Sequence, residues 1–149
     1  SVSLDEVDSA FKAGSFDTVI MMGNNFGLVS DGEKARRRLK KLYVVTSPGG
    51  RILAETVDLH KVRDPRERGQ DFSAYMLYHK NNPARGRRCG MSVGRCRFRN
   101  LAERWREYIF VSEAEMGKLI KGTGWKISRI FRDLKQKNAI QYIAELVKE

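Results

Sequence analysis

Two asparagines that follow an apolar run are the first candidates for chemistry in this sequence. The run from Phe16 to Met22 is almost entirely apolar after Asp17, as in a strand covered on both faces, and Gly23, Asn24 and Asn25 come directly after it. Asparagine side chains donate and accept hydrogen bonds, so they can hold a polar ligand. In open α/β sheets ligands bind where parallel strands end, which makes this loop a candidate site. The same residues are also typical of an ordinary turn, and the sequence leaves both interpretations open.

Two acidic residues near the end of the next apolar run form a second candidate group. Arg51 to Val57 predicts another buried strand, with Glu55 near its end and Asp58 just beyond it. These carboxylates are candidates for facing a substrate, although charged residues at solvated strand ends are about as common. We expect no metal site and no catalytic dyad, because the histidines and cysteines are few and scattered: His60, His79, Cys89 and Cys96.

A strand, a helix and a second strand must position these residues. Ser30 to Glu33 matches the S-x-x-E capping box, and Ala35, Leu39 and Leu42 then form an apolar face at helical spacing. Pro48-Gly49-Gly50 ends the helix at the latest and precedes the second apolar run. The order predicts a βαβ unit whose two strands are parallel and joined by a right-handed crossover.

The C-terminal part predicts one more helix and two more strands. Ser112 to Glu115 is a second capping box, and the strands are expected over residues 125–132 and 139–147. A helix is also expected from Asp64 to about Tyr78. The length of 149 residues fits one domain of the α/β class.

Positive charge is concentrated in the middle of the chain. Lys and Arg number 29 against 18 Asp and Glu, giving a net charge of +11, and residues 60–106 hold 13 of the basic residues but only four acids. Alternation predicts strands over residues 91–99 and 103–111, joined as a hairpin through residues 100–102, with Arg95, Arg97 and Arg99 on one face. This segment either contacts phosphate or another anionic group, or is a solvated surface.

Three short segments together resemble a known family. Gly14 to Asn24 is similar to the fourth strand of class I S-adenosylmethionine-dependent methyltransferases, Ser47 to Leu53 to the entry of their fifth strand, and Thr123 to Ile127 to the entry of their last strands. The order covers most of residues 5–147 and resembles the C-terminal half of that fold, with the Gly23-to-Gly27 loop closest to small-molecule N-methyltransferases. The family's glycine-rich cofactor loop has no counterpart in these 149 residues.

The resemblance implies a partial Rossmann-like sheet, a parallel βαβ unit plus C-terminal antiparallel strands, with a hairpin in an insertion at residues 58–111 that carries substrate residues. It implies S-adenosyl-L-methionine as cofactor, with Asp5, or alternatively Asp8, accepting from the adenine amine. The other implied cofactor residues are Gly23, Asn24 and Asn25. The implied substrate residues are Glu55, Asp58, Tyr75, Tyr78, Arg97 and Tyr108.

The partners and the state of the chain follow from these expectations. The methyl acceptor is expected to be a small molecule, with an anionic one as an option, or an RNA. The 149 residues alone are expected to be inactive and to bind the cofactor weakly or not at all. A nucleic-acid-binding module and a non-catalytic assembly partner remain alternatives. Because the resemblance covers only the C-terminal half of the fold, the family's first three strands are missing and the strand at residues 16–22 is left as a sheet edge with apolar faces. Such an edge predicts a homodimer or a higher homo-oligomer that covers it. No membrane span or signal peptide is found in the sequence, and a cytoplasmic location is expected.

Overall fold

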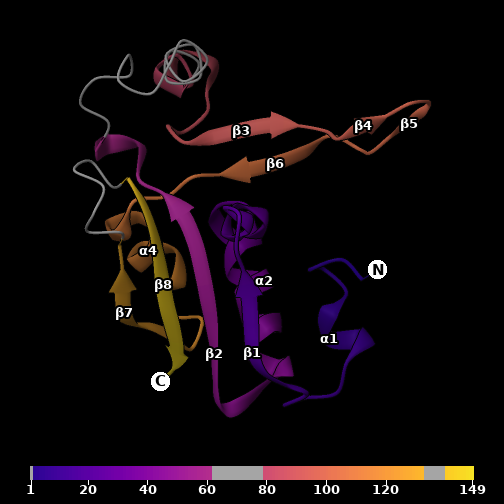
Figure 1. Cartoon of the computed structure of the whole chain (residues 1–149), viewed down its shortest axis with the longest axis vertical. Helices are drawn as coiled ribbons and strands as arrows, with labels where there is room; N and C mark the ends of the chain where they lie inside the picture. The colour runs from indigo at the N-terminus through magenta and orange to yellow at the C-terminus, as the bar shows by residue number, and fades with distance from the viewer. Residues whose placement is uncertain (1, 62–78, 133–139) are drawn as a thin grey trace.

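The fold is built on a four-stranded mixed sheet. The computed structural model describes residues 2–61, 79–132 and 140–149. The strand order is β1-β2-β8-β7, and the strands are β1 (Phe16–Met21), β2 (Thr46–Val57), β8 (Gln141–Lys148) and β7 (Trp125–Phe131). β1 is parallel to β2, whereas β8 is antiparallel to both of its neighbours (Figure 1). The predicted parallel pair followed by antiparallel C-terminal strands is confirmed.

Helix α2 (Gly32–Val45) connects the two parallel strands. Its buried side chains are Ala35, Leu39, Leu42 and Val45, which are the predicted apolar stripe extended by one residue. β2 follows at once, beginning at Thr46 rather than at the expected position 51. The pairing of β2 with β1 moves from Phe16–Thr46 to Thr18–Arg51, so the Pro48-Gly49-Gly50 segment bulges out of the ladder instead of separating helix from strand.

The two predicted capping boxes differ in outcome. Ser112 and Glu115 cap helix α4 (Glu113–Ile120) reciprocally, as predicted, with the Glu115 amide donating to Ser112 Oγ at 3.3 Å and the Ser112 amide donating to Glu115 Oε2 at 2.7 Å. The box at Ser30 is wrong, because the N-cap of α2 is Asp31 and no side chain caps the helix. The Ser30 hydroxyl instead donates to Glu107 Oε2 at 2.9 Å. A hydrogen bond to a residue 77 positions away thus replaces the predicted contact with Glu33.

Trp125 anchors the core between α2 and the sheet. Only 2% of its surface is exposed, and its Nε1 donates to the Leu39 carbonyl at 2.9 Å. The Tyr43 ring packs edge-on against it at 5.6 Å between centroids. Gly124, just before Trp125, has φ +88°, and a Cβ there would lie 2.6 Å from Cε2 of the Tyr43 ring. The Gly-Trp pair is therefore required both by backbone conformation and by packing.

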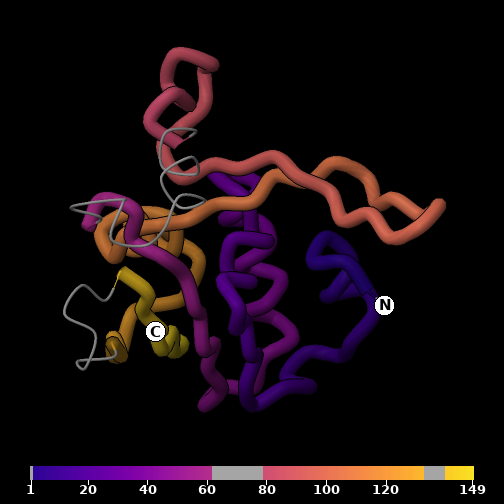
Figure 2. Tube along the Cα trace, turned by 45° about the horizontal axis from the view of Figure 1, so that its top comes forward, coloured from indigo at the N-terminus to yellow at the C-terminus, as the bar shows by residue number. Residues whose placement is uncertain are grey.

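Residues 91–109 form an arm that extends beyond the sheet (Figures 1 and 2). At its base β3 (Met91–Gly94) pairs antiparallel with β6 (Arg106–Ile109), and farther out β4 (Arg97–Phe98) pairs with β5 (Leu101–Ala102). The predicted hairpin is present. Its turn is at Arg99 and Asn100, one residue earlier than expected, with Arg99 at φ 52°.

A bulge divides the arm into its two ladders. Residues 95–96 on one strand lie opposite residues 103–105 on the other, and the Glu103 amide donates to the Cys96 carbonyl at 3.0 Å. An extra residue on one strand interrupts the alternation and increases the local twist. The extra residue is on the 103–105 strand, so Arg95 and Arg97 keep their spacing on the other strand, whereas Arg99 lies in the turn at φ 52° and does not extend the predicted face.

The remaining described elements are short. They are α1 (Val7–Ala10), η1 (Asn25–Val29), η2 (Leu59–Lys61) and η4 (Pro83–Arg85). The helix predicted at residues 64–78 and the turn at residues 135–138 lie outside the described residues. No helix in the described part of the chain is both long enough and apolar enough to span a membrane.

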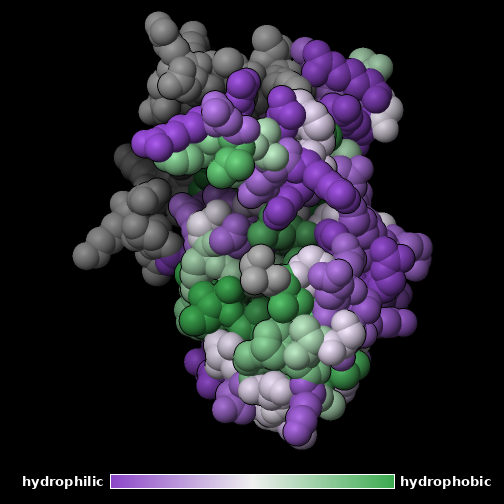
Figure 3. All heavy atoms as spheres, turned by 90° about the vertical axis from the view of Figure 1, so that its right-hand side faces the viewer, coloured by the Kyte–Doolittle hydropathy of each residue, from purple (hydrophilic) through white to green (hydrophobic). Residues whose placement is uncertain are grey.

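The outer edge of β1 has no strand partner among the described residues. Ile20, on this strand, is 67% exposed. Figure 3 looks onto this side of the molecule and shows apolar side chains gathered on its lower half. Backbone groups and apolar side chains are thus both open to an additional partner at this edge.

Candidate active site

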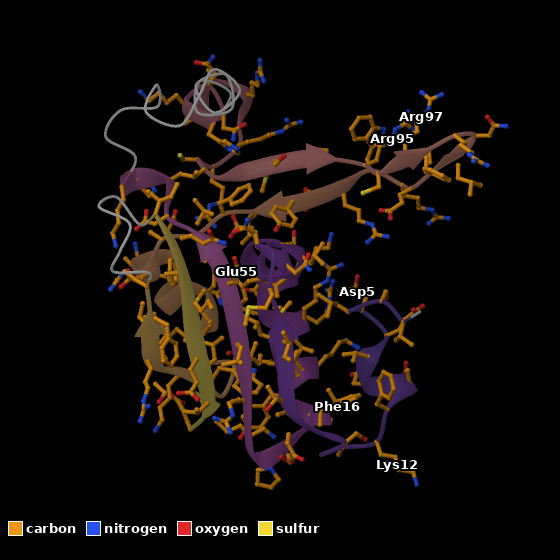
Figure 4. All side chains as sticks on the ribbon, in the orientation of Figure 1. Asp5, Lys12, Phe16, Glu55, Arg95 and Arg97 are labelled. Carbon is orange, nitrogen blue, oxygen red and sulfur yellow. The ribbon has the colours of Figure 1, made fainter. Side chains whose placement is uncertain are left out.

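The loop after β1 meets the end of β2 at one edge of the sheet. The Gly23 amide donates to Glu55 Oε2 at 2.5 Å. The Glu55 carboxylate also accepts from the side-chain amide of Gln141, the first residue of β8. Parallel strands place their carboxyl ends together, and the structure brings Glu55 to the Gly23 loop for that reason. Figure 4 shows Glu55 on β2 beneath the base of the arm.

The loop itself has an unusual backbone. Gly23 has φ 64° and Asn24 has φ 63°, so two consecutive residues are left-handed. Glycine adopts this conformation without cost, and asparagine is among the few other residues that tolerate it. Asn24 is the N-cap of η1, and the exposed Asn25 is its first residue. The sequence Gly-Asn-Asn therefore suits the turn whether or not it also binds a ligand.

Tyr108, in strand β6 of the arm, contacts this loop through its side chain. Its hydroxyl donates to the Asn24 carbonyl. Burial, together with the nearby negative charge of Glu55, raises the pKa of Tyr108 to about 12. The hydroxyl is therefore protonated at neutral pH and stays a hydrogen-bond donor. It helps to fix the position of Asn24.

Gly27 allows the arm to approach the loop this closely. A Cβ at Gly27 would lie 2.7 Å from Cε1 of Tyr108 and nearer still to the carbonyl oxygen of Ile109. No side chain larger than hydrogen fits there without movement of β6. The Gly27 position thus couples the loop to the base of the arm.

One buried polar atom of the loop has no partner. Asn24 Oδ1 is buried and accepts no hydrogen bond from any residue that the structure describes. Such an acceptor is costly to leave unpaired and usually marks a place for a water or a ligand donor. The atom lies at the carboxyl end of β1, where α/β folds bind ligands.

The two predicted adenine acceptors are on the N-terminal segment and are engaged by α2. Arg38 donates to both carboxylate oxygens of Asp5, through Nε to Oδ1 at 2.9 Å and through Nη2 to Oδ2. This hydrogen bond holds the pKa of Asp5 below its usual value. Lys41 pairs with Asp8 at 2.5 Å and likewise lowers the pKa of Asp8. Asp5 lies across β1 from Glu55 (Figure 4).

A hollow of about 320 Å³ lies along α2 but apart from the Glu55 cluster. Its lining is mostly charged and comprises Asp8, Glu33, Arg36, Arg37, Lys40, Lys41 and Val44. Asp8 is the one predicted site residue among these side chains. We place the candidate site at the sheet edge instead, because the unpaired acceptor and the strand ends lie there.

Two other predicted substrate residues, Asp58 and Arg97, do not join the cluster. Asp58 is buried and directly precedes η2, where its carboxylate accepts from the His60 amide at 3.0 Å and lies 3.7 Å from Lys61 Nζ. Arg97 is exposed on β4, far along the arm from Glu55 (Figure 4). Tyr75 and Tyr78 lie outside the described residues.

Sequence reasoning missed Gln141, Gly27 and Glu107. The sequence offers no specific signal for Gln141, because the strand is expected to begin at position 139 and also contains the charged Glu145. Nothing near Gly27 or Glu107 in the sequence indicates their contacts, which join η1 to β6. Within the described ranges no group of three or more His, Cys, Asp or Glu residues is placed to hold a metal ion.

The fold is similar to that of several solved methyltransferases. A protein from Bacteroides fragilis, described as a SAM-dependent methyltransferase in complex with S-adenosyl-L-homocysteine, matches with a TM-score of 0.62 and 17% identity over 95% of this chain and 52% of its own. A SAM-dependent methyltransferase from Methanosarcina mazei matches with a TM-score of 0.57 and 16% identity over 96% of this chain and 64% of its own.

A third similar structure has a small molecule bound. The 1,6-didemethyltoxoflavin-N1-methyltransferase of Burkholderia thailandensis, with 1,6-didemethyltoxoflavin and S-adenosylhomocysteine, matches with a TM-score of 0.53 and 12% identity over 96% of this chain and 48% of its own. No protein-family model and no curated protein matches the sequence. The chain spans about half to two thirds of the length of these three structures.

These structural similarities establish the fold of this chain. Identities of 12–17% are too low to transfer an activity or a residue role, but the match covers nearly all of this chain. The expected architecture, inferred from the Gly14-to-Asn24, Ser47-to-Leu53 and Thr123-to-Ile127 segments, is therefore confirmed. The chain has part of the Rossmann-like fold of class I S-adenosylmethionine-dependent methyltransferases.

Proposed function

We propose that this chain is part of an S-adenosylmethionine-dependent methyltransferase and that its Gly23-to-Asn25 loop contacts the cofactor. The observation that carries the proposal is the unpaired, buried Asn24 Oδ1 at the carboxyl end of β1, in a fold shared with methyltransferases. Ligands of open α/β sheets bind at that edge, and an unpaired acceptor there favours a ligand with a donor group.

The residues present fit the cofactor. S-adenosylmethionine, when bound, supplies a methyl group on a sulfonium sulfur for in-line transfer to a nucleophile. Asn24 Oδ1 accepts from an ammonium or hydroxyl group, and Asp5 keeps lone pairs for an amine beside its Arg38 contact. The Glu55 carboxylate adds negative charge at the same edge, which favours a cationic ligand and stabilises positive charge that develops on an acceptor amine.

A small molecule is the methyl acceptor that we favour, and an RNA is the second candidate. The small-molecule choice is supported by the Gly23-to-Gly27 sequence and by the Burkholderia thailandensis methyltransferase with its bound small molecule. The RNA candidate is supported by the arginine-rich arm. Residues 58–111 are proposed as the substrate element in both cases.

A titration with S-adenosylhomocysteine followed by amide NMR tests the cofactor site. We expect shift changes concentrated at Gly23, Asn24 and Asn25, with an affinity weaker than micromolar because no glycine-rich cofactor loop occurs in these 149 residues. Asn24→Gly keeps the left-handed backbone and removes Oδ1, so it should abolish most of the response. Asn25→Ser, at an exposed neighbouring position, is the matched control. No change at the loop, or an undiminished response of Asn24→Gly, would contradict the proposal.

A further inference from the structure

The outer part of the arm carries unpaired positive charge. Arg95, Arg97, Arg99 and Arg104 are exposed and make no ion pair with an acidic residue in the part of the chain that the structure describes. Of the two acids in the arm, Glu103 pairs with Arg106 at 3.2 Å. Glu107 contacts Ser30 and Lys34 at the base. Four guanidinium groups are therefore available to an anionic partner.

Exposed aromatic rings are interleaved with these arginines. Phe98 is 68% exposed and Trp105 is 64% exposed. The Arg95 guanidinium lies 4.9 Å from the Trp105 ring centroid, and the Arg99 guanidinium lies 5.2 Å from the Phe98 ring centroid. Gly94 pairs with Arg106, so the same register carried one residue further brings Arg95 opposite Trp105. Each ring thus has a cation beside it and most of its surface open.

We propose that the arm, residues 91–109, binds single-stranded nucleic acid, with the arginines on phosphates and the rings of Phe98 and Trp105 stacking on bases. Single-strand binding surfaces combine positive charge along the backbone with exposed aromatic rings, which is the combination found here. The arm extends away from the sheet, with Arg95 and Arg97 on its outer part (Figure 4), so a strand reaches it without obstruction from the core. This binding does not depend on the proposed methyl transfer.

A membrane surface fits the arm less well. A loop that enters a bilayer carries its apolar residues at the tip, whereas the two tip residues are Arg99 and Asn100. Phe98 and Leu101 flank the tip, but insertion deep enough to bury them would bring the Arg99 guanidinium into the hydrocarbon region. Duplexes also fit less well, since their bases are not free to stack on Phe98 and Trp105.

Salt dependence measures the phosphate contacts. Four contacts to a single strand predict a slope of log affinity against log salt of about −3, so a fourfold rise in salt weakens binding about 50-fold. The triple variant Arg95→Ala, Arg97→Ala, Arg99→Gly leaves one contact, and the same rise should weaken it only about threefold. Glycine is used at position 99 because φ there is 52°. The control triple Arg37→Ala, Lys40→Ala, Lys126→Ala removes equal charge from exposed positions outside the arm and should keep the wild-type slope.

Tryptophan fluorescence measures the stacking. Trp105 is exposed, whereas Trp125 is 2% exposed and gives a constant background. Oligouridylate and oligothymidylate should both quench the emission of the wild-type protein, and Trp105→Phe should remove the quenching while retaining affinity. Trp105→Ala should weaken binding roughly 5- to 150-fold. Comparison of the two oligonucleotides distinguishes RNA from DNA, and circular dichroism checks that every variant is folded.

Four results would overturn the proposal. The first is that the wild-type chain shows no salt-dependent binding to either oligonucleotide, and the second is that the control triple loses as much of the salt dependence as the arm triple. The third is that the chain binds a duplex of the same length as tightly as it binds the single strand. The fourth is that the arm binds phosphatidylserine vesicles but no oligonucleotide. The titrations contain no S-adenosylmethionine. A negative result in the oligonucleotide titrations would therefore not contradict the proposed cofactor site. A negative result in the cofactor titration would likewise not contradict nucleic-acid binding by the arm.

Discussion

Adding one methyl group at Gly27 tests how the candidate site is positioned. Gly27 lies in η1 directly against β6, and a Cβ there would be 2.7 Å from Cε1 of Tyr108. Carbon atoms in contact normally lie about 3.5–4.0 Å apart, so Gly27→Ala must move the ring by about 1 Å. The hydroxyl of the same ring donates to the Asn24 carbonyl, so the movement also strains the contact that holds the loop.

The expected loss of stability combines three contributions. Overpacking costs about 1–3 kcal/mol. Weakening the Tyr108–Asn24 hydrogen bond adds about 0.5–1.5 kcal/mol. The lower entropy of an unfolded chain with alanine in place of glycine offsets about 0.4–1 kcal/mol. We therefore expect Gly27→Ala to lower the free energy of unfolding by about 0.5–4 kcal/mol, or about 2 kcal/mol at the midpoints, which corresponds to a fall in Tm of about 4–8 °C.

Urea denaturation followed by circular dichroism measures this change, and Gly49→Ala is the matched control. Gly49 has no atom within 4 Å of an added Cβ and no positive φ, so its change should stay within about 0.5 kcal/mol. The amides of Gly23 and Asn24 should exchange faster only in Gly27→Ala. If the two alanine variants have the same stability and the same loop exchange, β6 does not hold the loop, and the positioning role assigned to Tyr108 is wrong.

Three further predictions concern pH, capping and assembly. The pKa of Tyr108 is raised from 10.0 to about 12, so the stability that its protonated hydroxyl contributes is complete below pH 10 and is lost as the pH rises through 12. The free energy of unfolding of Tyr108→Phe should therefore depend less on pH between pH 10 and 12 than that of the wild-type protein. Ser112→Ala should cost about 1 kcal/mol in thermal or urea unfolding by removing the α4 cap, whereas the exposed Ser128→Ala should not. The open edge of β1 should make the chain oligomeric, and Ile20→Lys should shift it to monomer in light scattering; a wild-type monomer at high concentration would refute this.

Periodic segments were predictable because a local pattern determines them. Ala35, Leu39 and Leu42 are spaced to bury one face of a helix, and α2 buries that face. The capping box at Ser112 joins residues only three positions apart, so the sequence alone is enough to predict it. Local reasoning fails at β2, which begins at Thr46 because β1 pairs with that residue and lets the next segment bulge. It fails again in the arm, where the extra residue on one strand is visible only in the pairing.

The candidate site was predictable only in part. The rule that parallel strands end at one edge placed the Gly23 loop near Glu55, and the structure joins them by a hydrogen bond. The same rule cannot say that Gln141 shares the Glu55 carboxylate, because that contact depends on β8 inserting beside β2. Asp58, three residues after Glu55, folds into its own turn instead. Closeness to Glu55 in the sequence therefore did not predict which residues share its site once the strand had ended.

The geometry of the loop depends on a strand that follows it by some 80 residues. Both ends of η1 are non-glycine residues with positive φ, Asn24 at 63° and Ser30 at 69°. Such conformations cost about 1–3 kcal/mol each and persist only where surrounding structure fixes them. Here the neighbours Tyr108 and Glu107 of β6 do so, one bonded to the Asn24 carbonyl and the other to the Ser30 hydroxyl. A single strand at the base of the arm therefore fixes the backbone that presents Asn24 Oδ1, and any ligand that displaces β6 must also change the candidate cofactor site.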